Sequence, residues 1–146
     1  MTQKLQLEKV NTIIAEVIRW ASYCNNISAI ALVGSWARGT ARTDSDIDLM
    51  FLTPDPSYFK SDRAWIDEID WKSFGCDVVA WEDKDYGLVW SCHIYLTDET
   101  EIEFSFGHFS WASVNPIDAG TLSVVSNGCR ILYDPEGLLS QLLKYI

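Results

Sequence analysis

The sequence is poor in basic residues, in proline and in long hydrophobic runs. Only 11 of its 146 residues are Lys or Arg, against 21 Asp or Glu, so the formal net charge is −10. Such a charge repels nucleic-acid backbones and anionic membranes, and it argues against a protein that coats either one. It suits a cationic small molecule or a basic protein as partner. With 4 Pro and 8 Gly, the composition also excludes collagenous and low-complexity chains.

Cysteine is scarce as well, and its 4 residues form no Cys-x-x-Cys pair. This spacing disfavours both a disulfide scaffold and a clustered zinc site, so we expect reduced thiols. The first nine residues alternate polar and apolar side chains and lack the apolar core of a signal peptide. No apolar run approaches the length of a membrane span. We therefore expect a cytoplasmic protein that does not engage membranes.

The length and the hydrophobic periodicity predict one domain over residues 1–146. Helical spacing of apolar residues, or helix-start signals, predict helices at 10–21, 58–71 and after Asp134-Pro135. Short apolar or alternating runs predict strands at 27–33, 46–51, 76–81, 88–96, 101–106 and 130–133. The strands 88–96 and 101–106 flank the polar residues 97–100 and are expected to form a hairpin. Residues 107–127 show no regular pattern, and the charged run 82–85 reads as a solvated loop. The expected fold class is α/β (α+β), a small mixed β-sheet with helices packed on it.

A glycine turn and a pair of carboxylates are the features of the sequence that indicate a reaction site. Gly34 and Ser35 follow the buried strand 27–33. Glycine lets the backbone approach a ligand closely, successive N–H groups of such a turn bind anions, and a serine hydroxyl adds a donor for a phosphate. Asp46 and Asp48 lie two apart on the next strand, so their side chains project from the same face. Their mutual repulsion is relieved by a divalent cation, and Mg²⁺ shared with phosphates is the usual choice.

Residues 34–39 (Gly-Ser-Trp-Ala-Arg-Gly) and 45–49 (Ser-Asp-Ile-Asp-Leu) together resemble the signature of the DNA polymerase beta-like nucleotidyltransferase superfamily. Within that superfamily, the residues of these two motifs are most similar to those of aminoglycoside nucleotidyltransferases and of minimal nucleotidyltransferases that pair with HEPN-type toxins. The resemblance implies a nucleotidyltransferase-like fold and an enzyme that transfers a nucleoside monophosphate, with AMP from ATP as the expected case, to an acceptor hydroxyl. Pyrophosphate is then released, and two Mg²⁺ ions take part during turnover.

The resemblance also implies a third carboxylate on a neighbouring strand, as general base or metal ligand. We favour Glu103, in the alternating strand 101–106, with Asp77 as the rival. Asp46, Asp48 and Glu103 are then the catalytic and metal-binding residues. Gly34 and Ser35 bind the phosphates, and Arg38 and Arg42 are candidate clamps, because guanidinium groups bind phosphate oxygens in a fork.

Other residues near the motif have weaker assignments. Trp36, inside the turn, is a candidate cover for a base or a substrate ring. His93 and His108 have no carboxylate or Cys at ligand spacing, so we interpret them as structural, with an indirect role open for His108.

The sequence is compatible with three functions. The first is transfer to a small, cationic acceptor of the aminoglycoside type. The second is an antitoxin-type nucleotidyltransferase that acts on or binds a partner toxin protein. The third is a non-catalytic nucleotide-binding module. The helical domain with which antibiotic-modifying relatives complete their acceptor site is not in this sequence, so a homodimer or a protein partner is a further expectation. We expect no nucleic-acid partner.

Overall fold

Six strands form one mixed sheet in the computed structural model, which describes residues 3–146. The strands are β1 (Ala29–Val33), β2 (Ile47–Thr53), β3 (Val78–Asp85), β4 (Val89–Leu96), β5 (Glu101–His108) and β6 (Cys129–Tyr133). Their order across the sheet is β3-β4-β5-β2-β1-β6. Only β2 and β5 pair in parallel, and every other neighbouring pair is antiparallel. The expected fold class is confirmed: a mixed sheet with helices.

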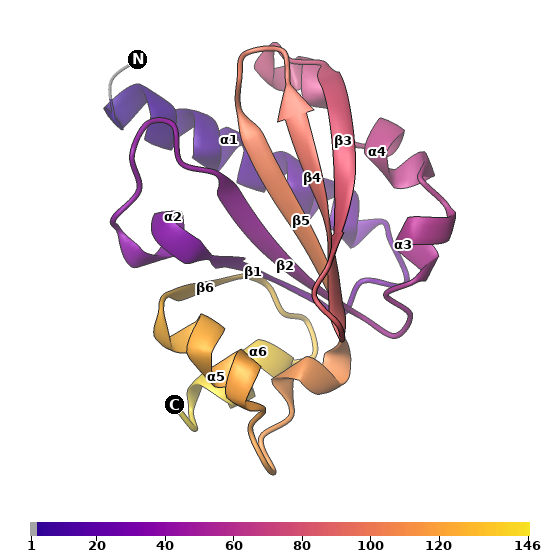
Figure 1. Cartoon of the computed structure of the whole chain (residues 1–146), viewed down its shortest axis with the longest axis vertical. Coiled ribbons are helices and arrows are strands. Elements are labelled where there is room, and N and C mark those ends of the chain that lie inside the picture. Colours follow the sequence, from indigo (N-terminus) through magenta and orange to yellow (C-terminus); the bar gives the residue numbers. More distant parts are fainter. Residues whose placement is uncertain (1–2) are drawn as a thin grey trace.

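One face of the sheet carries the main hydrophobic core. The helices are α1 (Gln3–Ser22), α2 (Gly34–Arg38), α3 (Tyr58–Ser61), α4 (Ala64–Glu68), α5 (Ala119–Ser126) and α6 (Leu138–Leu143), with 3₁₀ turns η1 (Trp71–Phe74) and η2 (Phe109–Ala112). The apolar stripe of α1, from Val10 to Ala21, is buried in the main core, and Figure 1 shows this helix crossing behind the strands. Phe51 stacks on Phe104 and Phe106 within that core, at centroid distances of 5.5 and 5.2 Å. This packing ties β2 to β5.

The opposite face is covered only in part. Met50 and Leu52 of β2 are buried with Val125 of α5 and Leu139 of α6 in a second, smaller core. Figure 1 places α5 and α6 together at the lower end of the sheet. Asp48 precedes Met50 on the same side of β2 and is only half-buried. The carboxylates of the motif therefore lie on the part of this face that the helices leave accessible.

The structure corrects four expectations about local structure. Residues 58–71 form two short helices and the start of a 3₁₀ turn instead of one helix. The charged run 82–85 belongs to β3, and the irregular region 107–127 contains η2 and α5, which Asp118 caps by accepting a hydrogen bond from the Thr121 amide. The last helix starts at Leu138, later than predicted. Asp134 still caps it, because its carboxylate accepts hydrogen bonds from the Leu139 and Ser140 amides.

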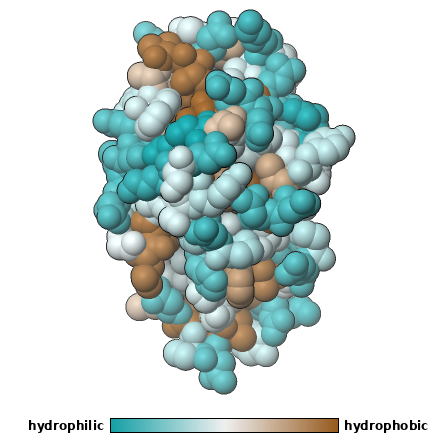
Figure 2. Space-filling view, turned by 90° about the vertical axis from the view of Figure 1, so that its right-hand side faces the viewer, coloured by the Kyte–Doolittle hydropathy of each residue, from teal (hydrophilic) through white to brown (hydrophobic). Residues whose placement is uncertain are grey.

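Strand β3 forms one edge of the sheet and is exposed along most of its length. Its acidic and basic side chains disfavour pairing with another sheet edge, because charged groups on an edge strand discourage strand addition. The side of the molecule that carries β3, α3 and α4 is largely hydrophilic, with scattered apolar patches (Figure 2). Among the residues described, no helix combines the length and the hydrophobicity required to cross a bilayer.

Candidate active site

The turn after β1 brings the backbone directly against a carboxylate. Gly34 follows Val33 with φ +75°, begins α2 and lies beside Asp48. A Cβ added at Gly34 would overlap Asp48 Oδ2 and lie 3.1 Å from Asp48 Cγ. Glycine is required here for two reasons: the left-handed backbone conformation and the space that the carboxylate occupies. The sequence motif therefore brings the Gly34 turn into contact with the Asp48 carboxylate.

The register of the sheet lines up the acidic residues. Asp48 is the direct neighbour of Glu103 in the parallel β2–β5 pair, and Glu103 is the direct neighbour of His93 in the antiparallel β5–β4 pair. Ile47 pairs with Ile102 in the same β2–β5 pair. Asp46 directly precedes Ile47 and Glu101 directly precedes Ile102, so these two acidic residues also lie next to each other. Since side chains alternate along each strand, all four carboxylates project from the same face.

Asp48 and Glu103 form the first carboxylate pair. The pKa of Asp48 rises to about 7, because the carboxyl is largely desolvated and lies beside Glu103, with which it shares a hydrogen bond, and near Asp46. Arg38 acts in the opposite direction and lowers this pKa. Two carboxylates that repel each other in a partly buried site gain most from a divalent cation. Their oxygens are the donors that Mg²⁺ prefers, so the donor set fits this ion.

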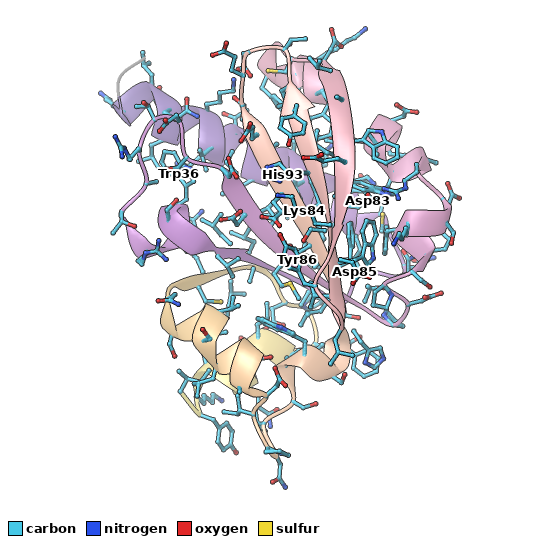
Figure 3. All side chains as sticks on the ribbon, viewed as in Figure 1. Trp36, Asp83, Lys84, Asp85, Tyr86 and His93 are labelled. Atoms are coloured by element: carbon cyan, nitrogen blue, oxygen red, sulfur yellow. The ribbon has the colours of Figure 1, made fainter. Side chains whose placement is uncertain are left out.

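Asp46 and Glu101 form the second pair. Glu101 has a raised pKa, first because of a hydrogen bond shared with Asp46 and then because of burial, whereas His93 and Lys84 lower it. His93 Nε2 lies 3.3 Å from Asp46 Oδ2 and 3.9 Å from Glu101 Oε2. In Figure 3, His93, Lys84 and Tyr86 lie over the strands at the centre of the sheet. Asp46, His93 and Glu101 form a group of side chains with the spacing of metal ligands.

The structure distinguishes the two candidates for the third carboxylate. Glu103 is next to Asp48, and Tyr86 donates a hydrogen bond of 3.3 Å to its Oε1. Asp77 is exposed and lines a separate cavity with Asp70 and Lys72. Only Glu103 is therefore placed to act together with Asp46 and Asp48.

The remaining predicted residues lie around the turn. Ser35 is half-buried in the first turn of α2. Arg38 is exposed, and its guanidinium donates to Thr40 Oγ1 and to the Asn127 carbonyl, both at 3.1 Å. Arg42 is exposed in the loop that precedes β2, where its amide donates to Ser45 Oγ. Both cations are near the motif, but the structure shows neither guanidinium in contact with a site carboxylate.

Trp36 differs from its expected role as a cover for a substrate ring. Its indole packs against the main core, and Nε1 donates a hydrogen bond of 3.2 Å to the Ser45 carbonyl. Figure 3 shows it apart from His93 and Tyr86. Trp36 thus holds the loop between α2 and β2. His108 has the structural role we expected, since its Nδ1 accepts a hydrogen bond from the Ser110 amide at the start of η2.

Sequence reasoning gave no role to Glu101, Lys84 or Tyr86, and it interpreted His93 as structural because no carboxylate lies at ligand spacing from it in the sequence. The structure instead brings Asp46 and Glu101 next to His93. The alternation of residues 101–106 did place Glu101 on the same face as Glu103. This pattern could have identified Glu101 as a further site residue. His93 reaches the site from β4, and Lys84 and Tyr86 reach it from the end of β3. The predicted hairpin of 88–96 with 101–106 is confirmed as the β4–β5 pair, whereas no local pattern revealed that β3 pairs with β4 or that β5 pairs with β2.

Replacing Gly34 with Ala tests the contact between the turn and Asp48. We expect Gly34→Ala to displace the Asp48 carboxylate and to reduce transfer activity by roughly 100-fold or more, as a misplaced reacting group does. Gly75→Ala is the matched control, because Gly75 has φ +76° and a Cβ there meets no atom within 4 Å. Activity and melting temperature are measured for both variants. Equal losses of activity would contradict a specific role of the contact.

A cavity opens directly beside the carboxylates. It has a volume of about 600 Å³ and lies between the sheet and the η2–α5 region, with a lining of Val33, Met50, Tyr86, Leu88, Val89, Ser105, His108, Ser110, Trp111, Asp118, Gly120, Thr121 and Val124. Met50 and Ser105 directly follow Asp48 and Glu103 on this face of β2 and β5. Another cavity, of about 680 Å³, lies between α1 and the α3–α4 region, away from this face. Neither cavity is lined by the four carboxylates themselves.

Comparison with known proteins agrees with this geometry. A family model described as a nucleotidyltransferase domain matches residues 12–97, which include the turn, Asp46 and Asp48. A crystal structure of an aminoglycoside 6-adenyltransferase from Bacillus subtilis has a similar fold, with a TM-score of 0.51 and 14% identity over 70% of this chain. This chain spans 36% of the length of that structure. Curated protein sequences gave no significant match.

The family match covers more than half of the chain and includes Gly34, Asp46 and Asp48. The chain therefore belongs to the nucleotidyltransferase domain family.

Proposed function

We propose that this nucleotidyltransferase transfers a nucleoside monophosphate, AMP from ATP, to a hydroxyl of a small acceptor in the presence of Mg²⁺. The observation that carries the proposal is the Asp48–Glu103 pair beside the Gly34 turn. A phosphate-binding turn adjacent to a cation-binding carboxylate pair brings together the two groups that a nucleoside triphosphate requires.

The reaction is an in-line displacement at the α-phosphorus. The acceptor oxygen forms a bond to this phosphorus, the bond to the bridging oxygen of the β-phosphate breaks, and pyrophosphate leaves with the electron pair. Glu103 accepts the proton of the attacking hydroxyl, since a positioned carboxylate is an effective general base even without an unusual pKa. Tyr86 holds Glu103 in place through its hydrogen bond to Oε1.

The other residues bind and orient the nucleotide. Asp46, Asp48 and Glu103 would hold Mg²⁺, and the bound ion would neutralise phosphate charge and make the attacking hydroxyl more acidic. The amides of Gly34 and Ser35 and the Ser35 hydroxyl donate hydrogen bonds to the β- and γ-phosphates. Arg38 ends α2 and Arg42 lies in the following loop, so both are near the Gly34 turn in sequence. After side-chain rotation their guanidinium groups donate charge-assisted hydrogen bonds to the leaving pyrophosphate.

The 600 Å³ cavity is the site that we assign to the acceptor. It adjoins Asp48 and Glu103 through Met50 and Ser105, and its volume is within the range of small-molecule sites. Apolar side chains such as Val89, Trp111 and Val124 line it together with Asp118. The lining favours a small molecule with an apolar face. The net charge of −10 favours a cationic group on the acceptor.

Release of pyrophosphate tests the function. The purified chain with ATP and Mg²⁺ is offered aminoglycosides, other amino-sugars and nucleosides, beside a pull-down of protein partners from native lysate. We expect pyrophosphate release with basic, hydroxyl-bearing acceptors, and an acceptor KM that rises with salt because exposed charges are screened. Activity only toward a captured protein would support the antitoxin-type alternative. Nucleotide binding without any transfer would support the non-catalytic module.

Filling the cavity tests the acceptor site. Val124→Trp adds an indole to the lining from α5 and is expected to raise the acceptor KM about tenfold or more, because a filled pocket loses complementary contact area. Leu122→Trp is the control, since Leu122 is an exposed residue of the same helix that does not line the cavity. KM for ATP should stay unchanged in both variants. Equal acceptor KM values for the two variants would contradict the assignment of this cavity as the acceptor site.

A further inference from the structure

His93 is a buried histidine directed at two carboxylates without a conventional partner. Its relative exposure is 7%, and neither ring nitrogen makes a hydrogen bond to any group in residues 3–146. Nε2 nevertheless lies 3.3 Å from Asp46 Oδ2 and 3.9 Å from Glu101 Oε2. Buried polar groups in proteins are almost always satisfied by a partner, by water or by an ion. Within the described residues, the two ring nitrogens lack a hydrogen-bond partner at a position where Nε2 faces two carboxylates.

The ring orientation is fixed by its surroundings. Tyr95, two residues further along β4, stacks on the His93 imidazole with ring centroids 5.2 Å apart and an interplanar angle of 12°. The Tyr95 hydroxyl is held in turn by a hydrogen bond of 2.6 Å to Glu82 on β3. This support keeps Nε2 facing the gap between Asp46 and Glu101. An imidazole whose orientation is fixed before an ion binds is favourable for a metal ligand, and here the stacked Tyr95 ring provides that support.

We propose that Asp46, His93 and Glu101 form a binding site for a transition-metal ion of the Zn²⁺ type, occupied without nucleotide. The three ligand atoms lie within 4.8 Å of one another. Ligand atoms around tetrahedral Zn²⁺ are about 3.4 Å apart, given bond lengths of about 2.1 Å. The His93–Asp46 distance of 3.3 Å already meets this value, and the His93–Glu101 distance of 3.9 Å needs a small rotation of an exposed carboxylate.

The donor chemistry separates this site from the Mg²⁺ site. An imidazole nitrogen favours Zn²⁺, Co²⁺ or Ni²⁺, whereas an all-oxygen set such as Asp48 with Glu103 favours Mg²⁺. Three protein ligands leave the fourth tetrahedral position of the ion for water or substrate. The ion would also neutralise the negative charge of the Asp46–Glu101 pair. Asp46 belongs to both sites, so an ion at His93 holds this carboxylate in position for the second site.

The rival explanation is an ion pair in which a protonated His93 bridges Asp46 and Glu101. It accounts for the distances but predicts no metal affinity. The two explanations therefore differ in direct binding measurements with the metal alone, which do not depend on any assumption about catalysis.

Titration of the metal-stripped, full-length chain with Co²⁺, in the absence of nucleotide, tests the proposal. We expect one equivalent of Co²⁺ to bind with the visible absorption of a tetrahedral ion, to be displaced by Zn²⁺, and not to be displaced by a large excess of Mg²⁺. His93→Gln is expected to weaken binding about 100-fold or more, because it removes a direct ligand. His108→Gln is the matched control and should bind like the wild type, since His108 bonds only within its own turn.

Glu101→Gln tests the site from a second ligand and should weaken Co²⁺ binding as well. If either variant unfolds, nitrogen coupling from an imidazole in the electron-spin-echo spectrum of Cu²⁺-loaded wild type gives the same answer. Absence of Co²⁺ binding, or wild-type affinity in His93→Gln, would overturn the proposal and favour the ion pair. Pyrophosphate release by a chain that binds no Co²⁺ would leave the proposed function intact, so the two failures are distinguishable.

Discussion

Asp46→Asn and Asp48→Asn are each expected to lower kcat/KM for nucleotidyl transfer by on the order of 1,000-fold or more. An amide in place of either carboxylate removes a negative charge where a cation and a triphosphate must meet. Asp48 is the more severe case, because Gly34 and Glu103 both lie against it. Pyrophosphate release at saturating ATP, together with thermal shifts produced by Mg²⁺-ATP, measures the effect.

Asp44→Asn is the matched control, since Asp44 precedes the pair by two residues and is exposed. It changes the net charge by the same amount and should retain nearly full activity. A ligand-induced thermal shift that persists in Asp46→Asn and Asp48→Asn would contradict the assignment of the cation site.

Loss of activity in Asp48→Asn should accompany a gain in stability of the metal-free protein. The pKa of Asp48 is raised from 3.8 to about 7 in the folded chain. The folded state therefore holds this proton more tightly than the unfolded state, so stability from this group is present below about pH 4 and is lost as the pH rises toward 7. Asp48→Asn lacks this loss and should be more stable at pH 8 by roughly 1–3 kcal/mol. Melting curves in EDTA at pH 5 and pH 8 measure the difference.

Glu103→Gln is expected to lower kcat by roughly 100- to 10,000-fold, the range for loss of a general base. Nucleotide affinity should change much less, because Asp46, Asp48 and the Gly34 turn remain in place. The separation of kcat from KM for ATP distinguishes a base from a residue that only shapes the site. Single-turnover assays with saturating acceptor give the rate of the chemical step directly.

Asp77→Asn is the control for Glu103→Gln. Asp77 is exposed and lines a different cavity, so the substitution should leave kcat near the wild-type value. The reverse ranking of the two variants would assign the base to Asp77. A large rise in KM for ATP in Glu103→Gln, at unchanged kcat, would instead limit Glu103 to nucleotide binding.

Local patterns were sufficient for much of the fold. The apolar spacing of residues 10–21 and the alternation of residues 46–51 and 101–106 correspond to α1, β2 and β5. These patterns are reliable because helix and strand periodicity set which side chains share a face. They failed at residues 58–71 and 82–85, where short helices and an exposed edge strand are stabilised by tertiary contacts instead of by a local apolar stripe. One domain over 1–146 stays a prediction.

The sequence by itself determined the glycine turn, the shared face of Asp46 and Asp48, and the shared face of Glu101 and Glu103, because each depends on residues a few positions apart. Only the tertiary structure decided that Asp48 lies next to Glu103 and that His93 faces Asp46 and Glu101. The order and register of β4, β5 and β2 are set by packing of the sheet against α1, with Phe51, Phe104 and Phe106 stacked in the core. The pairing of distant strands depends on the burial of side chains from the whole chain, and for that reason no local pattern contains it.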